Sequence, residues 1–297
     1  MAGDAPMARR APADAFALVG NETRAEILRV LGEEPWAGLS FSELRSRVDP
    51  DLDSGQFNYH LQQLVGQFVR HTDDGYEMRP AGVTLYRTIR AGTFSRTATV
   101  EPFEAGFDCY FCGSTVEASY EDGIFHLRCP GCEHVYSHTM APPSAVEGVA
   151  REELLARIDQ YNRHTMLAFA RGVCPVCVHG VDREFIPGES AWSEGAERFD
   201  LFVRHTCGYC GNRHFMSVGL ALLYRPLVVC FFHGRGLDVT SAPHWELEFA
   251  MTDRDVTVRS RDPWEVALET TCDGDRLELV VDETLGLVEQ RVVSDVE

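Results

Sequence analysis

The segment DSGQFNYHLQQLVGQFVRHTDDGYEMRPAG, residues 53–82, carries the strongest local signals for the fold. Asp53-Ser54 is a typical helix cap, and the apolar residues of FNYHLQQL follow it at i, i+4 and i+7. Two strand-like runs, FVRHT and YEM, flank the turn-forming residues Asp73-Asp74-Gly75. Pro80 stands where proline commonly occupies the first turn of a helix. The segment predicts a helix, a two-stranded hairpin and the start of another helix.

Two more helices are expected upstream of this segment. GNETRAEILRVLG has helical apolar spacing with Asn21 as a candidate cap, and SELRSRV (42–48) opens on Ser42. A last helix, AGVTLYRTIRAG, follows the hairpin. Three helices, a hairpin and a closing helix predict a winged helix-turn-helix domain at residues 12–92.

The polar face of the 53–65 helix is a candidate surface for reading DNA. Gln and Asn can hydrogen-bond base edges in the major groove without carrying charge, and arginines at the hairpin could meet phosphates. The acidic turn at 73–74 opposes phosphate contact, so a winged helix that binds only protein is the alternative. The candidate DNA-binding residues are Ser54, Gln56, Asn58, Tyr59, Gln62, Gln63, Arg70 and Arg79.

The charge of the chain restricts where a polyanion could bind. The formal net charge is -19, with 46 acidic residues, and all 27 basic residues are arginine. This composition favours a protein kept soluble in molar salt, although an acidic protein from a high-GC genome is the alternative. Residues 1–100 hold 11 Arg and 13 acids, a net of -2, whereas residues 101–297 hold 16 Arg and 33 acids, a net of -17. Only the first third could approach DNA without strong repulsion.

Eight of the ten cysteines form four C-x-x-C pairs. The first two pairs along the chain are separated by 16 residues, which is typical of a zinc ribbon. The segment TVEASYEDGIFHLR between them predicts a hairpin. Between the last two pairs the separation is 29 residues, which an inserted loop, GESAWSEGAE (188–197), would explain. We expect two structural Zn²⁺ sites, each closed by four thiolates. The expected ligands are Cys109, Cys112, Cys129 and Cys132 for one site, and Cys174, Cys177, Cys207 and Cys210 for the other.

Alternatives exist for each cysteine. A redox dithiol is the other common use of C-x-x-C, and His134 or His214 could replace a thiolate. Cys230 and Cys272 lie among apolar, strand-forming residues and are expected to be buried and inert, with redox sensing as the alternative.

The remaining segments define an α+β chain. GTFSRTATVEPFEAG (92–106) resembles a linker, and REELLARIDQYNRHTMLAFARG (151–172) predicts a connecting amphipathic helix. After about residue 245, WELEFAM, DVTVRS, WEVALET, RLELVVD and GLVEQRVV predict an antiparallel meander. We expect a first ribbon with the connecting helix at 101–172 and a second ribbon with the meander at 173–297.

The sequence predicts a cytoplasmic protein without a membrane segment. The first 20 residues lack the apolar core of a secretory signal. The most apolar run, VGLALLYRPLVVCFF (218–232), is interrupted by Arg225-Pro226 and is too short to cross a bilayer. The cysteines are therefore expected to be reduced.

LVGNETRAEILRVL and FNYHLQQL, followed by GQFVRHTDDGYEMRPAG, resemble the ArsR-like winged-helix regulators of salt-loving archaea over about residues 13–92. The remainder is similar to zinc-ribbon extensions on such regulators. The resemblance implies DNA binding, a role in transcription and a homodimer. The metal-sensing cysteine of those regulators has no counterpart, because no cysteine precedes Cys109.

The expected function is a sequence-specific transcriptional regulator, not an enzyme, with double-stranded DNA as partner. Transcription machinery or an effector molecule are further candidate partners. The alternative is an interaction protein of the transcription machinery without operator specificity, and a dithiol oxidoreductase is a third hypothesis.

Overall fold

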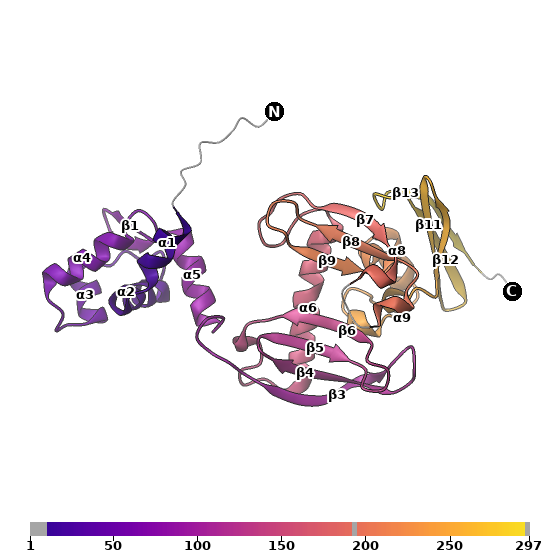
Figure 1. Ribbon diagram of the computed structural model, residues 1–297, viewed down its shortest axis with the longest axis horizontal. Helices are drawn as coiled ribbons and strands as arrows, with labels where there is room; N and C mark the ends of the chain where they lie inside the picture. Colours follow the sequence, from indigo (N-terminus) through magenta and orange to yellow (C-terminus); the bar gives the residue numbers. More distant parts are fainter. Residues whose placement is uncertain (1–10, 192–194, 295–297) are drawn as a thin grey trace. The chain divides into compact units, whose positions relative to one another are not determined.

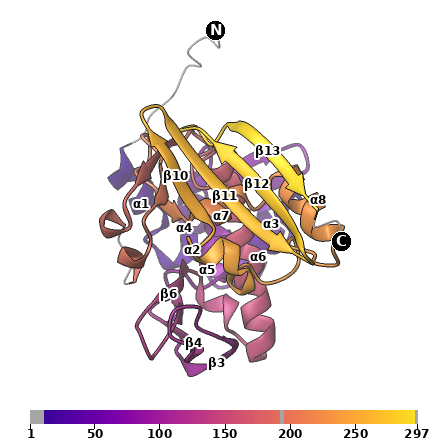
Figure 2. The same cartoon turned by 90° about the vertical axis from the view of Figure 1, so that its right-hand side faces the viewer.

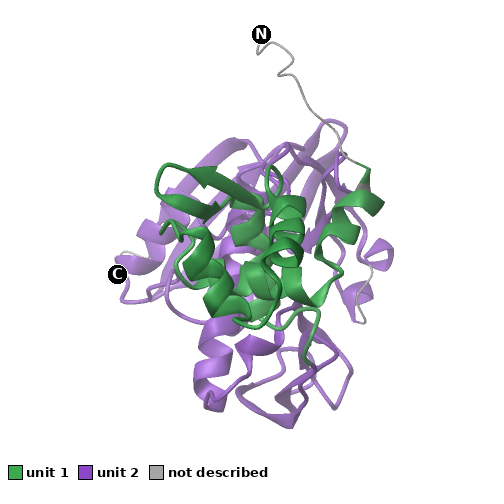
Figure 3. Cartoon of the chain, turned by 90° about the vertical axis from the view of Figure 1, so that its left-hand side faces the viewer, with its two compact units in different colours: residues 1–96 green, residues 97–297 purple. Residues whose placement is uncertain are grey.

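The computed structural model describes residues 11–191 and 195–294. The chain is an α+β protein with several antiparallel sheets (Figure 1). It divides into two compact units, coloured separately in Figure 3: unit 1 ends at Arg96 and unit 2 begins at Thr97. No helix among the described residues is long and apolar enough to cross a membrane.

Unit 1 contains five helices and one two-stranded sheet in the part that the structure describes. In chain order the elements are α1 (Pro12–Val19), α2 (Glu22–Glu33), α3 (Phe41–Val48), α4 (Ser54–Leu64), β1 (Val69–Thr72), β2 (Gly75–Met78) and α5 (Pro80–Arg90). Strands β1 and β2 pair antiparallel, as the sequence predicted. One hydrophobic core joins the helices to this hairpin, and it includes the fully buried Ile27, Leu44 and Phe57.

Side-chain caps set the starts of three of these helices. The Asn21 side chain accepts from the Arg24 amide, and Asp53 accepts from the amides of Gly55 and Gln56. The helix predicted at 42–48 was expected to start at Ser42, and that expectation was wrong. Ser40 instead caps α3 in a capping box with Glu43. The Ser40 side chain accepts from the Glu43 amide, and the Glu43 carboxylate accepts from the Ser40 amide, so two backbone N–H groups that lack a helical partner are satisfied.

The described residues of unit 2 form three antiparallel sheets, joined by helices. The first sheet consists of β3 (Val100–Asp108), β4 (Thr115–Glu121), β5 (Ile124–Arg128) and β6 (Val135–Met140). The second sheet consists of β7 (Asp182–Ile186), β8 (Phe202–Thr206) and β9 (Arg213–Met216). The third sheet consists of β10 (Val256–Arg261), β11 (Trp264–Cys272), β12 (Asp275–Val281) and β13 (Leu287–Val293). The helices are α6 (Arg151–Ala170), α7 (Val218–Leu222), α8 (Pro226–His233) and α9 (Glu248–Met251), with 3-10 turns at Pro143–Ala145, Gly188–Ser190, Ala196–Arg198 and His244–Glu246. Figure 2 shows the β10–β13 meander.

Helix α6 links the two hydrophobic cores of unit 2. Leu154 and Ile158, in its first half, belong to the core of the β3–β6 sheet. Met166 and Phe169, in its second half, belong to a larger core with β8, β9, α7, α8 and the meander. The connecting helix that the sequence predicted is therefore confirmed, and it is part of both cores.

Two segments differ from the expected elements. The second half of the expected linker 92–106 is strand β3, which pairs with β4 and buries Phe103 and Ala105. WELEFAM is a 3-10 turn and helix α9, not a strand. Its apolar residues alternate as in a strand, with Glu246 and Glu248 exposed between them, but the consecutive residues Phe249, Ala250 and Met251 are all buried, which a strand with one exposed face does not allow.

Cys230 was expected to be buried, and that expectation was wrong. It lies on helix α8, whose buried residues Val228, Phe231 and Phe232 follow helical spacing, so Cys230 falls on the exposed side. Cys272, at the end of β11, is partly buried. Of the expected loop at 188–197, residues 192–194 lie outside the described residues, and 3-10 turns flank them.

Candidate metal centres and the exposed face of helix α4

The structure brings the eight predicted cysteines together in two groups of four. Within each group the four Sγ atoms all lie within 4.8 Å of one another. In the first group Cys109 and Cys132 are 3.7 Å apart, and Cys112 and Cys129 are 3.4 Å apart. Four thiolates at about 2.3 Å from a tetrahedral Zn²⁺ would have sulfurs about 3.8 Å apart. The geometry therefore fits a four-thiolate metal site.

The second group repeats this arrangement on the β7–β9 sheet. The Sγ atoms of Cys174 and Cys210 are 3.6 Å apart, and those of Cys177 and Cys207 are 3.4 Å apart. All ten cysteines are free thiols, so no disulfide competes with metal binding. The alternative ligands His134 and His214 belong to neither group among the described residues.

All four C-x-x-C segments adopt the same backbone turn. The amide of each first cysteine donates to a carbonyl five residues later: Cys109 to Ser114, Cys129 to His134, Cys174 to His179 and Cys207 to Asn212. The residue four positions after each first cysteine has a positive φ: Gly113 (75°), Glu133 (62°), Val178 (65°) and Gly211 (76°). The turn therefore favours glycine at that position, and two of the four turns hold a side chain there under strain.

Replacing Val178 by glycine is expected to stabilise the protein by about 1 kcal/mol. The left-handed conformation costs a β-branched residue about 1–2 kcal/mol, and Val178 is 77% exposed, so little burial is lost. Val176 is a matched control, because it is 72% exposed in the same turn and has no positive φ. Val176→Gly is expected to leave stability unchanged or lower it. Thermal unfolding of both variants measures this, and equal effects would contradict the strain argument.

The thiols of one group differ widely in acidity. Hydrogen bonds from the side chain and backbone of Ser114 lower the pKa of Cys112 to about 6. Burial and the neighbouring Cys112 raise the pKa of Cys129 to about 12. Adjacent thiols therefore oppose each other's ionisation, and a bound divalent cation would supply the charge that lets all four ionise.

The predicted DNA-binding residues of α4 lie together on its exposed face. Phe57, Leu61 and Leu64 are buried, as their spacing predicted. The exposed residues of the helix include Ser54, Gln56, Asn58, Tyr59, Gln62 and Gln63. Tyr59 is 60% exposed. The face therefore offers amide, hydroxyl and phenol groups and no charged side chain.

Both predicted phosphate-binding arginines are exposed, but each has an intramolecular partner. Arg70 on β1 pairs with Glu77 on β2 at 2.7 Å. Arg79 donates a hydrogen bond to the Gly66 carbonyl. Arg70 is therefore already neutralised by a carboxylate, and a phosphate would have to compete with it.

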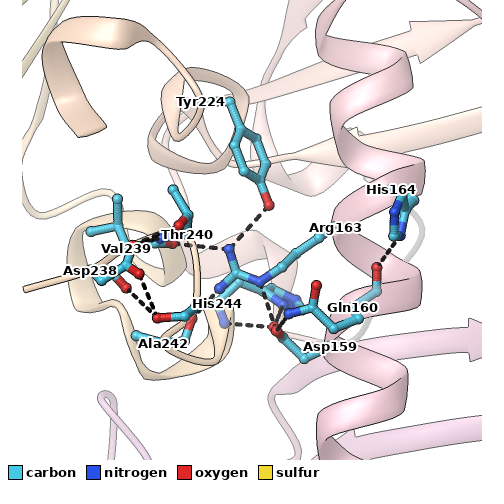
Figure 4. Close-up of polar contacts among 11 residues, drawn as sticks. Asp159, Gln160, Arg163, His164, Tyr224, Asp238, Val239, Thr240, Ala242 and His244 are labelled. Carbon is cyan, nitrogen blue, oxygen red and sulfur yellow. Dashed lines mark hydrogen bonds and ion pairs between the residues drawn. The ribbon is translucent and has the colours of Figure 1, made fainter. Parts of the chain in front are cut away.

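Sequence reasoning missed a buried polar cluster on α6 (Figure 4). Arg163 Nε donates to Asp159 Oδ2 at 2.7 Å, while the amide and Nδ1 of His244 contact Asp159 Oδ1 at 2.8 and 2.6 Å. Burial alone would raise the pKa of Asp159, but these hydrogen bonds outweigh it and lower the pKa. The i,i+4 spacing of Asp159 and Arg163 was visible, but nothing local identified His244, which is 85 residues away.

Comparison with known protein families gives two matches. A family described as a domain of unknown function, DUF7347, matches residues 12–89. A second, also described as a domain of unknown function, DUF7351, matches residues 106–287. Comparisons with curated proteins and with solved structures give no match. The DUF7351 match spans more than half of the chain and contains all eight clustered cysteines, and the chain therefore belongs to the DUF7351 family.

Proposed function

We propose that the chain is a sequence-specific DNA-binding transcriptional regulator whose unit 1 is a winged helix-turn-helix domain. The observation that carries the proposal is the exposed face of α4, which consists of neutral hydrogen-bonding side chains over a buried apolar face. The order of α2, α3 and α4, the β1–β2 hairpin and α5 supports it, since a recognition helix followed by a hairpin is the arrangement of such domains.

Neutral side chains suit DNA recognition at the salt concentration that the composition suggests. At about 1 M salt the Debye length is about 3 Å, so charges separated by more than contact distance hardly interact. Counterion release also contributes little there, which weakens phosphate-based affinity. Short-range hydrogen bonds from Gln62 and Gln63 to base edges do not depend on either effect.

We further propose that each four-cysteine group binds one structural Zn²⁺. The donor sets, four thiolates each, are those of zinc ribbons, and the Sγ distances fit. Four protein ligands leave no open coordination position for a substrate, so the ions would hold the β3–β6 and β7–β9 sheets together at their turns.

Replacing Gln62 by alanine is expected to weaken operator binding by about 1–3 kcal/mol, or roughly five- to 150-fold, and to relax sequence preference. Gln67, which follows the helix, is the control, and Gln67→Ala should bind as the parent does. Bound sites are first mapped across the genome at native salt, and affinities for them are then measured in molar KCl. An unchanged footprint and affinity for Gln62→Ala would contradict the assignment.

One observation favours a second function, an interaction protein of the transcription machinery. Arg70 and Arg79 both have intramolecular partners, and Asp73 and Asp74 form the exposed hairpin turn, so this hairpin offers little attraction to phosphate. Binding of random and genomic DNA separates the two functions. The interaction protein would show no preferred site anywhere in the genome.

A further inference from the structure

A cavity of about 560 Å³ lies within unit 2, and residues of β6, α6 and β9 line it. Its lining includes His134, which follows the first cysteine group, and Pro175 and Val176, which lie inside a C-x-x-C turn of the second. Its volume is in the range of about 300–1,000 Å³ that is typical of sites for small molecules.

The lining of this cavity is almost free of charge. Among the residues that the structure describes, Arg213 is the only permanently charged side chain of the lining, and none of the lining residues is an Asp or Glu, although a quarter of the chain is charged. Arg213 also borders a smaller hollow that it shares with Asp182 and Glu184. A charged ligand would lose its hydration on entering the main cavity and gain no buried counterion.

Aromatic rings form much of the remaining surface. His214 stacks on Phe169 with ring centroids 5.0 Å apart and an interplanar angle of 6°. Burial lowers the pKa of His214 to about 4, so the ring is neutral at pH 7. Phe199 and Phe202 add a second pair of rings, 4.6 Å apart. Such walls favour flat, apolar ligands.

One wall carries a closed ring of hydrogen bonds. Thr139 Oγ1 donates to Asn162 Oδ1 at 2.9 Å, and Asn162 Nδ2 donates to Ser137 Oγ at 3.0 Å. The 2.8 Å contact between Ser137 and Thr139 must then have Ser137 as donor. The ring orients the Asn162 amide, which keeps one N–H donor and one carbonyl lone pair for a ligand.

His244 adds a second oriented polar group. Burial lowers the pKa of His244, so its imidazole is neutral, and its Nδ1 contacts the ionised Asp159, which can only accept, so the proton is on Nδ1. The Nε2 atom is therefore an acceptor, and His244 is part of the cavity lining. Together with Asn162, it allows the cavity to hydrogen-bond a ligand that has both donor and acceptor groups.

The cavity has an apolar mouth at the surface. Met140, Tyr161 and Val176 belong to its lining and are 76%, 51% and 72% exposed. Exposed apolar side chains are unusual in a chain with a net charge of -19. Their position at the entrance to this cavity indicates an entry route for an apolar molecule.

We propose that this cavity is a binding site for a small, uncharged, planar organic molecule with hydrogen-bonding groups. The proposal goes beyond the DNA-binding function and does not depend on it, because every residue that carries it belongs to unit 2. The site holds its ligand by aromatic contact and by hydrogen bonds to Asn162 and His244, and it disfavours charged ligands because no buried counterion offsets their desolvation.

Two dyes with the same ring skeleton test the charge preference on the full, metal-loaded chain. N-phenyl-1-naphthylamine is neutral and has one N–H, and 8-anilinonaphthalene-1-sulfonate adds an anion. In molar KCl, where long-range attraction is screened, we expect the neutral dye to bind once per chain and the sulfonate at least tenfold more weakly. Absence of neutral-dye binding, or equal or tighter sulfonate binding, overturns the proposal.

Variants of neighbouring residues on α6 test the location. Thr165 lines the cavity, whereas His164 is exposed and does not. Thr165→Trp is expected to abolish neutral-dye binding by filling the cavity, and His164→Trp to leave it unchanged. Retained binding in Thr165→Trp places the dye elsewhere and overturns the proposal. If Thr165→Trp fails to fold, the comparison of the two dyes on the parent chain still tests the proposal.

Discussion

Replacing Cys129 by serine is expected to reduce the zinc content from two ions per chain to one and to lower the Tm of unit 2 strongly. Cys129 is fully buried in the core of the β3–β6 sheet, and its Sγ is 3.4 Å from that of Cys112. A structural zinc contributes about 10–16 kcal/mol of apparent binding free energy. A domain has a total stability of only about 5–15 kcal/mol. Metal analysis of the purified protein and thermal unfolding by circular dichroism measure both effects.

Cys230 provides a matched control for this substitution. It is exposed on α8 and belongs to neither cysteine group. Cys230→Ser should keep two zinc ions and an unchanged Tm. Equal metal content and stability in the Cys129 and Cys230 variants would show that the first group is not a metal site, and purification of the parent chain without metal would favour the dithiol oxidoreductase.

Replacing Arg163 by methionine is expected to destabilise unit 2 by about 3–5 kcal/mol, because it leaves the Asp159 carboxylate buried with an incomplete set of partners. The two side chains are only 4% and 3% exposed, and Arg163 also donates to Tyr224, Val239 and Ala242 (Figure 4). Urea unfolding in molar salt measures the loss. A buried pair is screened little by salt, so the effect should persist there.

The same helix provides a control with the same spacing. Arg157 pairs with Glu153 at i,i+4 on the exposed side of α6, where the two side chains are 48% and 53% exposed. Arg157→Met removes a solvated pair and should change stability by less than about 1 kcal/mol. A loss in Arg163→Met no larger than in Arg157→Met would mean that burial of the cluster does not matter.

Part of the fold could be predicted because its signals are local. Asp122-Gly123 and Asp273-Gly274 all have positive φ, which is the conformation of a tight hairpin turn and favours an Asp-Gly pair. They connect β4 to β5 and β11 to β12. The cysteine pairs were predictable for a similar reason, since each lies in one turn and the intervening hairpin brings two turns together.

Other features could not be predicted because they depend on what a segment packs against. Helix α9 lies so close to α7 that a Cβ on Gly219 would be 2.0 Å from the Phe249 carbonyl oxygen, and this contact covers Ala250, in a segment whose alternation suggested a strand. Cys230 is a similar case, because the apolar run that contains it forms helix α8 and Cys230 lies on the exposed side of that helix.

The sequence by itself determined the helix caps of unit 1 at Asn21 and Asp53, the polar face of α4, the Asp-Gly hairpins and the eight clustered cysteines. The caps, the helix face and the hairpins depend on residues that are close in the chain, and the cysteine groups depend on four turns with the same C-x-x-C spacing. Only the tertiary structure decided the contact of His244 with Asp159 and the cavity between β6, α6 and β9. Their residues are distant in sequence and carry no common pattern, and they meet only because α6 packs into both cores of unit 2.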